Sequence, residues 1–522
     1  MTRKVLKVVV LSLPGFLIFS ILLGTGLWGL DFGFHWDEKK LFFQVGKSLD
    51  SLTLLPQQYN YPSFSYWLTL SATIPHLFGA VQKLGYTIPP IRQHLLIVLE
   101  SPAYLLQVRQ IFLFLTSLSV LWVYYTSLVA WKRHWLEAFV AAAAIGFSWE
   151  VAYHSRWIAP DGILMQFSAL TLFGVVMAIK NPSKPSWLVV AAIAAGLGTG
   201  TKYQGVLLMI PVLTAAYIIS RENGGIRKLV PITLVILTLF GISYLFSTPG
   251  TILDPLRFFR DVVYELQHYQ SDHYGQFIQP GLPHFWLILR YFTQVFFSHF
   301  QPIAILFLFL FLLGAYDLIN ENIAEAIVIL SFPVLYLLFF SLQRVFIARN
   351  LLVVAPFLAI LVGRGSYFVW DLLHNWRFRW LWMALITTAL LVNASWLIYS
   401  ANTITDRKTD RFIRELATYI DNHPQTSYFV SDRVTQDLQS LDTTEHKNIV
   451  KTSFDQADFV ILYASEGFSS KIEWPRNKPG LTSRVFGTWE VNFDYYPTWS
   501  GDDRIVLLPM DKAIKIGVLV IE

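Results

Sequence analysis

The sequence of 522 residues contains no cysteine, which excludes disulfide bonds, thiolate zinc sites and cysteine nucleophiles but leaves the compartment open. Charge is also scarce, because Asp, Glu, Lys and Arg make up 14% of the chain, whereas soluble globular chains carry roughly 25%. Hydrophobic residues reach 54%, and the mean hydropathy is +0.48. This balance excludes a disordered chain, a coiled coil, a nucleic-acid-binding protein and a soluble multidomain enzyme. Most of the chain is expected to lie in lipid.

Aromatic residues, in contrast, are abundant: 18 Trp, 24 Tyr and 41 Phe make up 16% of the chain. Such side chains suit the interfacial belts of a membrane protein, where amphipathic rings settle at the depth of the lipid headgroups.

The charged residues divide the chain into two parts. Residues 401–522 carry 14 Lys/Arg and 18 Asp/Glu, whereas the first 400 residues carry only 26 and 17. We therefore predict a membrane domain over residues 1–400 and a soluble domain over residues 401–522. In the second part a helical pattern precedes short apolar strands, which predicts a small α/β domain; the helix is expected at 411–420 and the strands at 428–430, 459–462, 505–508 and 516–521.

Apolar runs long enough to cross a bilayer predict a polytopic α-helical membrane protein with about eleven transmembrane helices. They lie near residues 5–30, 108–130, 135–153, 161–180, 186–200, 204–220, 229–247, 298–317, 324–342, 350–370 and 378–400. The first run opens with basic residues like a signal peptide. It stays apolar for too long and lacks a small-residue cleavage site, so we predict a retained anchor.

The positive-inside rule gives the orientation. With the N-terminus in the cytoplasm, the short inner loops and the N-terminus carry twelve Lys/Arg, and the short outer loops carry four. We predict an integral protein of the inner or plasma membrane whose soluble domain is extracytoplasmic, because the helix count is odd. Two outer segments, 31–107 and 248–297, are too long for simple connectors and are expected to contain interfacial helices.

Ionisable side chains at membrane depth are costly and usually functional. The predicted topology places nearly all of those in the membrane domain on its outer face: Asp37, Glu38, Arg156, Asp161, Lys202, His268, His273, Arg344 and Arg349. Carboxylates ringed by Lys and Arg suit a phosphate-bearing substrate beside a general base or a divalent cation. An amphiphilic substrate would enter sideways from the lipid.

Six of these residues also have a purely structural interpretation. Asp37, Glu38 and Asp161 would equally suit the acidic first turn of a helix, and Lys202 would suit a side chain that reaches to the interface. His268 and His273 are also typical of an interfacial segment. The four glycines from 196 to 205 predict close packing of helices rather than a phosphate-binding loop.

Four short motifs occur in a defined order. They are His35-Trp36-Asp37-Glu38, Tyr61-Pro62-Ser63, Ser155-Arg156-Trp157-Ile158-Ala159-Pro160-Asp161 and Gly198-Thr199-Gly200-Thr201-Lys202-Tyr203, followed by Thr248-Pro249, the stretch from His268 to Gly275 and the stretch from Arg344 to Pro356. In this order, over roughly residues 1–360, the chain resembles the GT-C superfamily of integral-membrane glycosyltransferases. The resemblance lies in the branch of the protein O-mannosyltransferases and lipid A aminoarabinose transferases, among phospholipid-carrier-dependent enzymes.

The resemblance implies a role for each matched position. Asp37 would be the principal catalytic carboxylate, acting as a base or, with Asp161, as a ligand of a divalent cation such as Mg²⁺ or Mn²⁺. Glu38 would support Asp37, and Asp161 would be the second acid of the cavity. Basic residues would approach the carrier phosphate, and further residues would line the substrate cavity: Lys40, Lys202, Arg344 and Arg349 in the first group, and Tyr61, Arg156, Tyr203, His268 and His273 in the second.

The implied reaction is an inverting transfer of a hexose or pentose from a polyprenyl-phosphate donor to a lipid, glycan or protein acceptor on the outer membrane face. Tyr61 departs from the lysine that the aminoarabinose transferases carry before the matching proline, which leaves phosphate contact there open. The sugar-binding trefoil loop of the eukaryotic mannosyltransferases is not visible, which disfavours a eukaryotic type of protein acceptor.

Two other classes of function remain open. Eleven helices with intramembrane charges would also suit a secondary transporter or a flippase of a phosphorylated amphiphile, although such proteins usually show inverted repeats, and none is evident here. A receptor or scaffold that uses the soluble domain would leave the membrane charges unexplained. The expected partners are the lipid-linked donor, membrane lipids and an acceptor, and no nucleic acid.

Overall fold

A computed structural model describes residues 3–30, 38–99, 101–131, 135–184, 186–223, 225–268, 270, 278–373, 375–408, 411–430, 434–435, 449, 457–463, 484–486 and 505–509. The chain forms two compact units. The first comprises Met1–Leu30, His35–Gln270 and Ile278–Ala401, and the second comprises Asp31–Phe34, Ser271–Phe277 and Asn402–Glu522. Each is described by itself.

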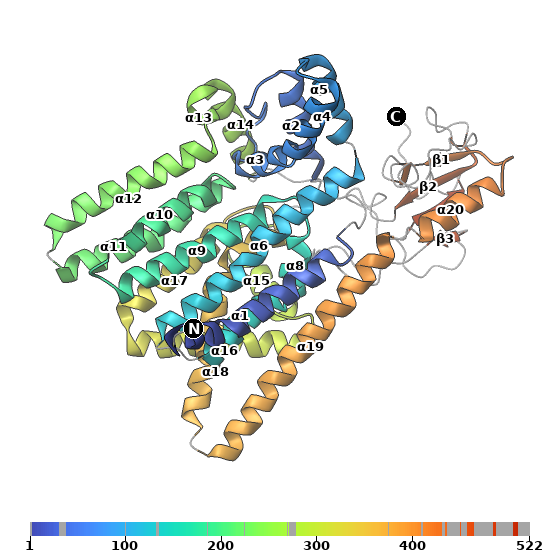
Figure 1. Cartoon of the computed structure of the whole chain (residues 1–522). Helices are drawn as coiled ribbons and strands as arrows, with labels where there is room; N and C mark the ends of the chain where they lie inside the picture. The colour runs from blue at the N-terminus through green and yellow to red at the C-terminus, as the bar shows by residue number, and fades with distance from the viewer. Residues whose placement is uncertain are drawn as a thin grey trace. The chain divides into compact units, whose positions relative to one another are not determined.

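All secondary-structure elements among the described residues of the first unit are helices (Figure 1). Its elements are α1 (Arg3–Leu27), α2 (Glu38–Asp50), α3 (Phe64–Ser71), α4 (Ile74–Leu84), α5 (Ile88–Leu99), α6 (Pro102–Ala130), α7 (Trp135–Gly146), α8 (Trp149–Ser155), α9 (Pro160–Lys180), α10 (Ser186–Thr199), η1 (Tyr203–Leu208), α11 (Met209–Asn223), α12 (Ile226–Ser247), α13 (Gly250–Leu253), α14 (Pro255–His268), α15 (Leu282–Tyr291), η2 (Phe292–Phe296), α16 (Gln301–Glu321), α17 (Ile323–Ser341), η3 (Ala348–Val354), α18 (Ala355–Leu372) and α19 (Trp376–Lys408).

All eleven predicted membrane runs are helical. Among the described residues, nine helices are long and apolar enough to cross a membrane. The run predicted at 135–153 is instead two helices, α7 and α8, bent by 58° at their junction. The run at 186–200 is the 14-residue helix α10, which is shorter than a usual span. The predicted helical membrane fold is confirmed, except that one predicted membrane helix is broken in two and another is short.

Capping residues explain several of the helix starts. The Ser101 hydroxyl accepts a hydrogen bond from the Tyr104 N–H at the start of α6, and Pro102 occupies the first helical turn. The Ser148 hydroxyl caps α8 through the Val151 N–H, which allows the chain to begin a new helix directly after the bend. Asn322 caps α17 in the same way.

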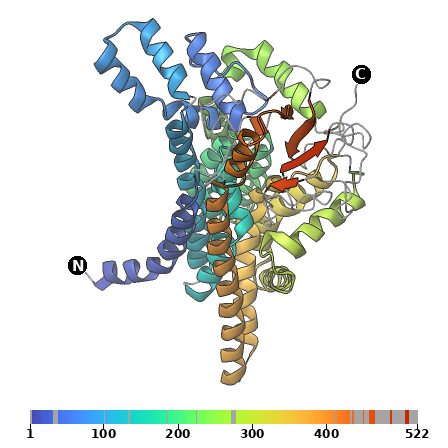
Figure 2. The same cartoon turned by 90° about the vertical axis from the view of Figure 1, so that its right-hand side faces the viewer.

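The two long segments that were expected to carry interfacial helices lie at one end of the membrane helices. Helices α2 to α5 and α13 to α14 gather there in both views of the chain (Figure 1 and Figure 2). We call this end of the bundle the loop end. Helices α3, α5, α6 and α9 share a buried apolar cluster that includes Tyr66, Leu99, Phe112 and Phe167, which anchors the loop end to the membrane helices.

The glycines of α10 allow a close helix contact. A methyl group on Gly196 would lie 2.5 Å from the carbonyl oxygen of Phe240 on α12, so only glycine fits. Gly205 is equally close to the backbone of Gly198. The close packing predicted for this stretch is therefore confirmed.

The second unit contains α20 (Arg411–Asp421) and a four-stranded sheet of order β1-β2-β4-β3. Strand β1 (Tyr428–Val430) runs parallel to β2 (Phe459–Tyr463), while β4 (Ile505–Pro509) pairs antiparallel with both β2 and β3 (Arg484–Phe486). The predicted strand at 516–521 lies outside the described residues, and β3 was not predicted.

Candidate active site

Glu38 is buried at the first turn of α2 and is paired with Arg109 of α6. The Arg109 guanidinium donates to both carboxylate oxygens, from Nε at 2.9 Å and from Nη2 at 2.6 Å, and neither side chain is exposed. Glu38 also accepts the N–H of Ile158 at 3.1 Å, and Arg109 donates to the Leu30 carbonyl at 2.9 Å. These bonds occupy its carboxylate and fix the start of α2, and its predicted supporting role beside Asp37 stays a prediction. Asp37, one residue earlier, lies outside the described residues.

Asp161 lies in the first turn of α9 and holds two cations. Its Oδ1 accepts a hydrogen bond from Lys202 Nζ at 2.8 Å, and its Oδ2 lies 3.3 Å from Arg349 Nε. All three side chains are at most 8% exposed. The sequence therefore brings one carboxylate and two basic groups together from three separate helix ends.

Asn350 extends this cluster. Its side-chain oxygen accepts a hydrogen bond from Lys202 Nζ at 2.5 Å, and its carbonyl accepts one from the Tyr336 hydroxyl at 2.7 Å. The Arg349 guanidinium lies 5.9 Å from the ring centroid of Trp157. These contacts orient the two cations, because each is held by a neighbour as well as by Asp161.

Hydrogen bonds join the predicted motifs to one another. The Phe64 N–H donates to the Gly200 carbonyl at 2.9 Å, and the Tyr203 hydroxyl donates to the Tyr59 carbonyl at 2.7 Å. The Ser63 N–H donates to the hydroxyl of Thr248 at 3.2 Å. The segment around Tyr61 is thus tied to the element that carries Lys202 and to the end of α12.

Lys40 and Tyr61 form a second, more exposed pair. Lys40 Nζ lies 5.8 Å from the ring centroid of Tyr61, within reach of a cation–π contact. Arg344 is exposed on the turn before η3, where its carbonyl accepts the Ile278 N–H at 2.9 Å. These two basic residues therefore lie outside the buried cluster of Asp161.

Arg156 binds backbone carbonyl groups and holds two segments of the chain together. Its guanidinium donates to the carbonyls of Ala152 and Thr25, at 2.5 and 2.6 Å, and lies 5.0 Å from the ring centroid of Trp149. It is fully buried and joins α8 to α1. The side chain of His268 is not among those described, and His273 lies outside the described residues, so their predicted role in the cavity stays a prediction.

Sequence reasoning missed a buried polar group on α8. Glu150 is fully buried, and its Oε1 accepts the Tyr291 hydroxyl at 2.9 Å. His154, one turn later, lies 3.6 Å from the same oxygen, and His299 lies 4.0 Å from Oε2. An acid and a histidine four residues apart within a membrane run were the signal that would have found them.

The described residues do not fit the expected divalent cation. They contain no group of three or more acidic or histidine side chains placed to hold a metal. Both oxygens of Asp161 already face cations, which disfavours a further positive ion at that carboxylate. The predicted pair of Asp37 and Asp161 is untested because Asp37 is not described.

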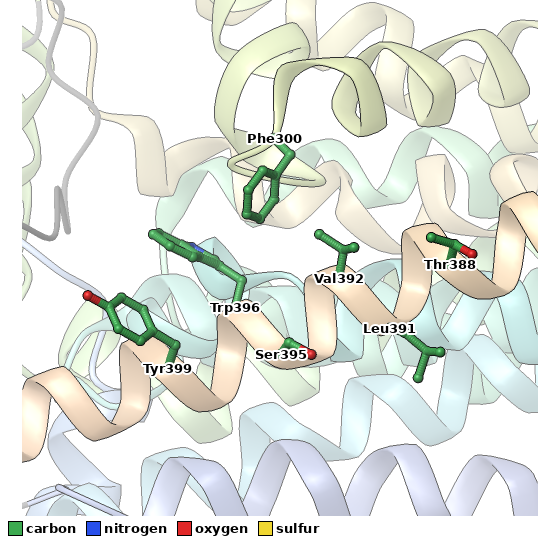
Figure 3. Close-up of a pocket in the computed structure, with 7 residues that line it drawn as sticks. All are labelled: Phe300, Thr388, Leu391, Val392, Ser395, Trp396 and Tyr399. Atoms are coloured by element: carbon green, nitrogen blue, oxygen red, sulfur yellow. The ribbon is translucent and has the colours of Figure 1, made fainter.

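An open groove of about 370 Å³ runs along α19 (Figure 3). Its lining is apolar and aromatic, with two hydroxyl side chains, and comprises Phe300, Thr388, Leu391, Val392, Ser395, Trp396 and Tyr399. None of the predicted site residues lines it, so the candidate active site rests on the charged cluster and not on this groove.

Residues 102–246 match the sequence profile of a family described as dolichyl-phosphate-mannose-protein mannosyltransferase. The matched range includes Asp161 and Lys202. This match confirms the predicted resemblance to the membrane glycosyltransferases of that branch. A comparison with curated protein sequences found no match.

Two solved structures are similar to the chain at low identity. ArnT from Cupriavidus metallidurans bound to undecaprenyl phosphate is 14% identical, with a TM-score of 0.47 and coverage of 94% of this chain and 97% of that one. The archaeal oligosaccharyltransferase AglB from Archaeoglobus fulgidus, in complex with an inhibitory peptide and a dolichol-phosphate, is 12% identical. Its TM-score is 0.47, and the match covers 84% of this chain and 65% of that one.

Proposed function

We propose that this integral membrane protein is an inverting glycosyltransferase that takes a sugar, a hexose or a pentose, from a polyprenyl-phosphate donor. The acceptor would be a lipid, glycan or protein on the extracytoplasmic face, where the predicted orientation places the loop end. The observation that carries the proposal is the buried contact of Asp161 with Lys202 and Arg349. The family profile, whose description names an isoprenoid-phosphate sugar, supports the class of donor.

The two basic groups of the cluster suit a leaving phosphate. Lys202 and Arg349 meet at one carboxylate, so both cations are buried and oriented in advance. Such preorganised groups stabilise charge that develops during a reaction more effectively than water does. Asp161 would hold the two cations in place, and Lys40 and Arg344 would contribute further positive charge from the exposed side.

Asp37 would serve as the general base. The acceptor hydroxyl would lose its proton to the Asp37 carboxylate while its oxygen forms a bond to the anomeric carbon of the sugar. The bond from that carbon to the phosphate oxygen would break at the same time, and its electron pair would leave with the carrier phosphate. One direct displacement inverts the configuration at the anomeric carbon.

The test is a transfer assay with purified protein in nanodiscs and a panel of polyprenyl-phosphate sugars. We expect wild-type protein to release polyprenyl phosphate, and Asp37→Asn to lose this activity. Asp50→Asn, the same change at an exposed position of α2, is the matched control and should retain it. Full activity of the Asp37 variant would show that the assigned base is wrong.

The alternative is a secondary transporter or flippase of a phosphorylated amphiphile. One observation favours it: the break between α7 and α8 resembles the discontinuous helices of transporters. The same nanodisc assay separates the two functions, because a flippase would move the lipid-linked sugar between leaflets without cleaving its bond to phosphate.

A further inference from the structure

The segment around Tyr59 is held by α14, although the two are 202 residues apart in the chain. Asp261 Oδ2 accepts the Tyr59 N–H at 2.9 Å. Asp261 is 7% exposed, and its other oxygen, Oδ1, accepts hydrogen bonds from the neighbouring Arg260, at 3.0 Å from Nε and 2.9 Å from Nη2. One oxygen of this buried carboxylate therefore accepts the backbone N–H of a residue that is distant in the chain.

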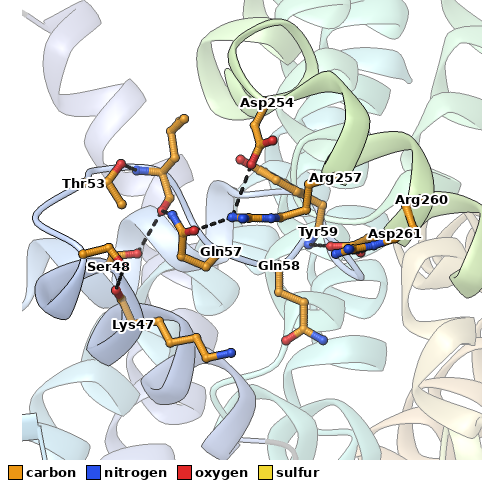
Figure 4. A network of polar contacts seen from close by, with 12 residues as sticks. Lys47, Ser48, Thr53, Gln57, Gln58, Tyr59, Asp254, Arg257, Arg260 and Asp261 are labelled. Atoms are coloured by element: carbon orange, nitrogen blue, oxygen red, sulfur yellow. Dashed lines mark hydrogen bonds and ion pairs between the residues drawn. The ribbon is translucent and has the colours of Figure 1, made fainter.

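Other residues of α14 contact the same loop (Figure 4). Arg257 donates to the side-chain oxygen of Gln57 and forms an ion pair with Asp254 at 3.4 Å. The Asn60 side chain approaches Glu265 at 3.5 Å. The side chains in these contacts are partly exposed, whereas Asp261 is buried.

Tyr59 is enclosed on its other sides as well. Its ring lies 5.8 Å from that of Phe258, which in turn lies 6.1 Å from the ring of Tyr203. A methyl group on Gly250 would overlap the Tyr59 ring, so α13 approaches it as closely as the backbone allows. Burial, helped by the charge of Asp254, raises the pKa of Tyr59 to about 12.

Both backbone polar groups of Tyr59 are thus bound by side chains. Its N–H is held by Asp261 and its carbonyl by the Tyr203 hydroxyl, next to Lys202. Tyr61 follows two residues later, at the pair that it forms with Lys40. Two bonds on one residue fix the path of the chain, because they leave the peptide planes on either side of it no freedom to rotate.

We propose that Asp261 is a positioning residue for the donor site. By accepting the Tyr59 N–H, it holds Tyr61 and Lys40 where the carrier phosphate of the donor binds. The proposal rests on the proposed function, and it assigns a task to α14 in the second long segment.

The kinetic test compares three variants in nanodiscs while the donor concentration is varied. Asp261→Ala removes the acceptor, and we expect the donor KM to rise about tenfold, the usual scale for a lost hydrogen bond to a charged group, with kcat changed much less. Asp261→Asn keeps an oxygen acceptor for the Tyr59 N–H and loses only the charge, so it should restore most of the affinity. Asp50→Ala, the same change at an exposed position of α2, should leave KM unchanged.

Hydrogen exchange of the peptide that spans residues 53–63 gives a readout independent of activity. Asp261→Ala should speed exchange in this peptide, and Asp50→Ala should not. Unchanged exchange, or equal KM values in Asp261→Ala and wild type, would overturn the proposal. If exchange responds as expected but wild-type protein transfers no sugar, the positioning role of Asp261 stands and the glycosyltransferase function fails.

Discussion

Glu38 and Arg109 form a fully buried, two-bond ion pair between the start of α2 and the second turn of α6. Through the Ile158 N–H and the Leu30 carbonyl, the pair also joins the turn before α9 to the end of α1. Four chain segments therefore meet at two side chains, next to the residue proposed as the base.

Replacing Arg109 by lysine should weaken this junction. Lysine keeps the charge but lacks the planar fork that reaches both Glu38 oxygens and the Leu30 carbonyl. We expect a loss of about 1–3 kcal/mol, the cost of leaving a buried polar group unsatisfied, visible as a lower melting temperature in detergent. Arg290→Lys, at an exposed position, is the control. Equal melting temperatures of the two variants would contradict the importance of the fork.

Neutralising Asp161 should cost more stability than neutralising Lys202. Asp161→Asn leaves Lys202 and Arg349 buried without their shared counter-charge, whereas Lys202→Met leaves Asp161 paired with Arg349. Breaking a buried pair typically costs about 3–5 kcal/mol. The double variant should be more stable than Asp161→Asn alone, because it buries one cation fewer. Thermal unfolding of the three proteins measures this order, and strictly additive effects would argue against a shared cluster.

Removal of divalent metal should leave activity intact. The carboxylate of Asp161 faces two cations, and charge on the leaving phosphate has Lys202 and Arg349 to neutralise it. We expect transfer rates in EDTA to match those in added Mg²⁺ or Mn²⁺. Loss of activity in EDTA with recovery on adding metal would show instead that Asp37 contributes to a metal site.

Gly196→Ala should separate α10 from α12. The new methyl group would lie 2.5 Å from a backbone carbonyl, which cannot rotate away as a side chain would. We expect destabilisation of about 1–3 kcal/mol, typical of overpacking. Gly79→Ala is the control, since nothing lies near that position. A Gly196 variant as stable as the Gly79 variant would mean that the two helices separate at little cost.

His284 should make the protein less stable in mild acid. Burial lowers the pKa of His284, against the opposing hydrogen bond to the Gln343 carbonyl, so the folded protein binds this proton less readily than the unfolded chain. The stability that neutral His284 contributes to the folded protein is fully present above the ordinary histidine pKa of about 6.5. It is lost as the pH falls through the lower pKa of the folded state. Melting temperatures of wild type and His284→Gln between pH 7.5 and about 5 should therefore converge toward acid. Parallel curves would contradict this.

The membrane helices followed from sequence because lipid imposes a minimum apolar length, and each predicted run is helical. The break between α7 and α8 did not, because the run stays apolar across it and only Ser148 followed by Glu150 signals a new helix start. For the same reason α10 was read as a span, although its 14 residues fall short of one.

The site was only partly predictable. Asp161, Lys202 and Arg349 were expected on the same face, because ionisable side chains at membrane depth are costly and the predicted topology places all three at the outer ends of helices. The ion pair of Glu38 with Arg109 was not predicted, since the two residues are 71 positions apart and Arg109 lies inside an apolar helix. Arg109 was itself the signal, as a lone ionisable residue in a membrane run. The contact of Asp261 with Tyr59 had no sequence signal, because a backbone N–H is the same at every position.

The short helix α10 would set the depth of the proposed reaction in the membrane. Fourteen residues rise about 21 Å, which is roughly 9 Å less than the hydrocarbon core of a bilayer. Lys202 follows directly after this helix, and α10 begins just beyond Lys184 at the opposite end. If the donor phosphate binds at Lys202, as proposed, it would lie below the plane of the neighbouring headgroups. Water is scarce in that layer, so hydrolysis would compete poorly with transfer.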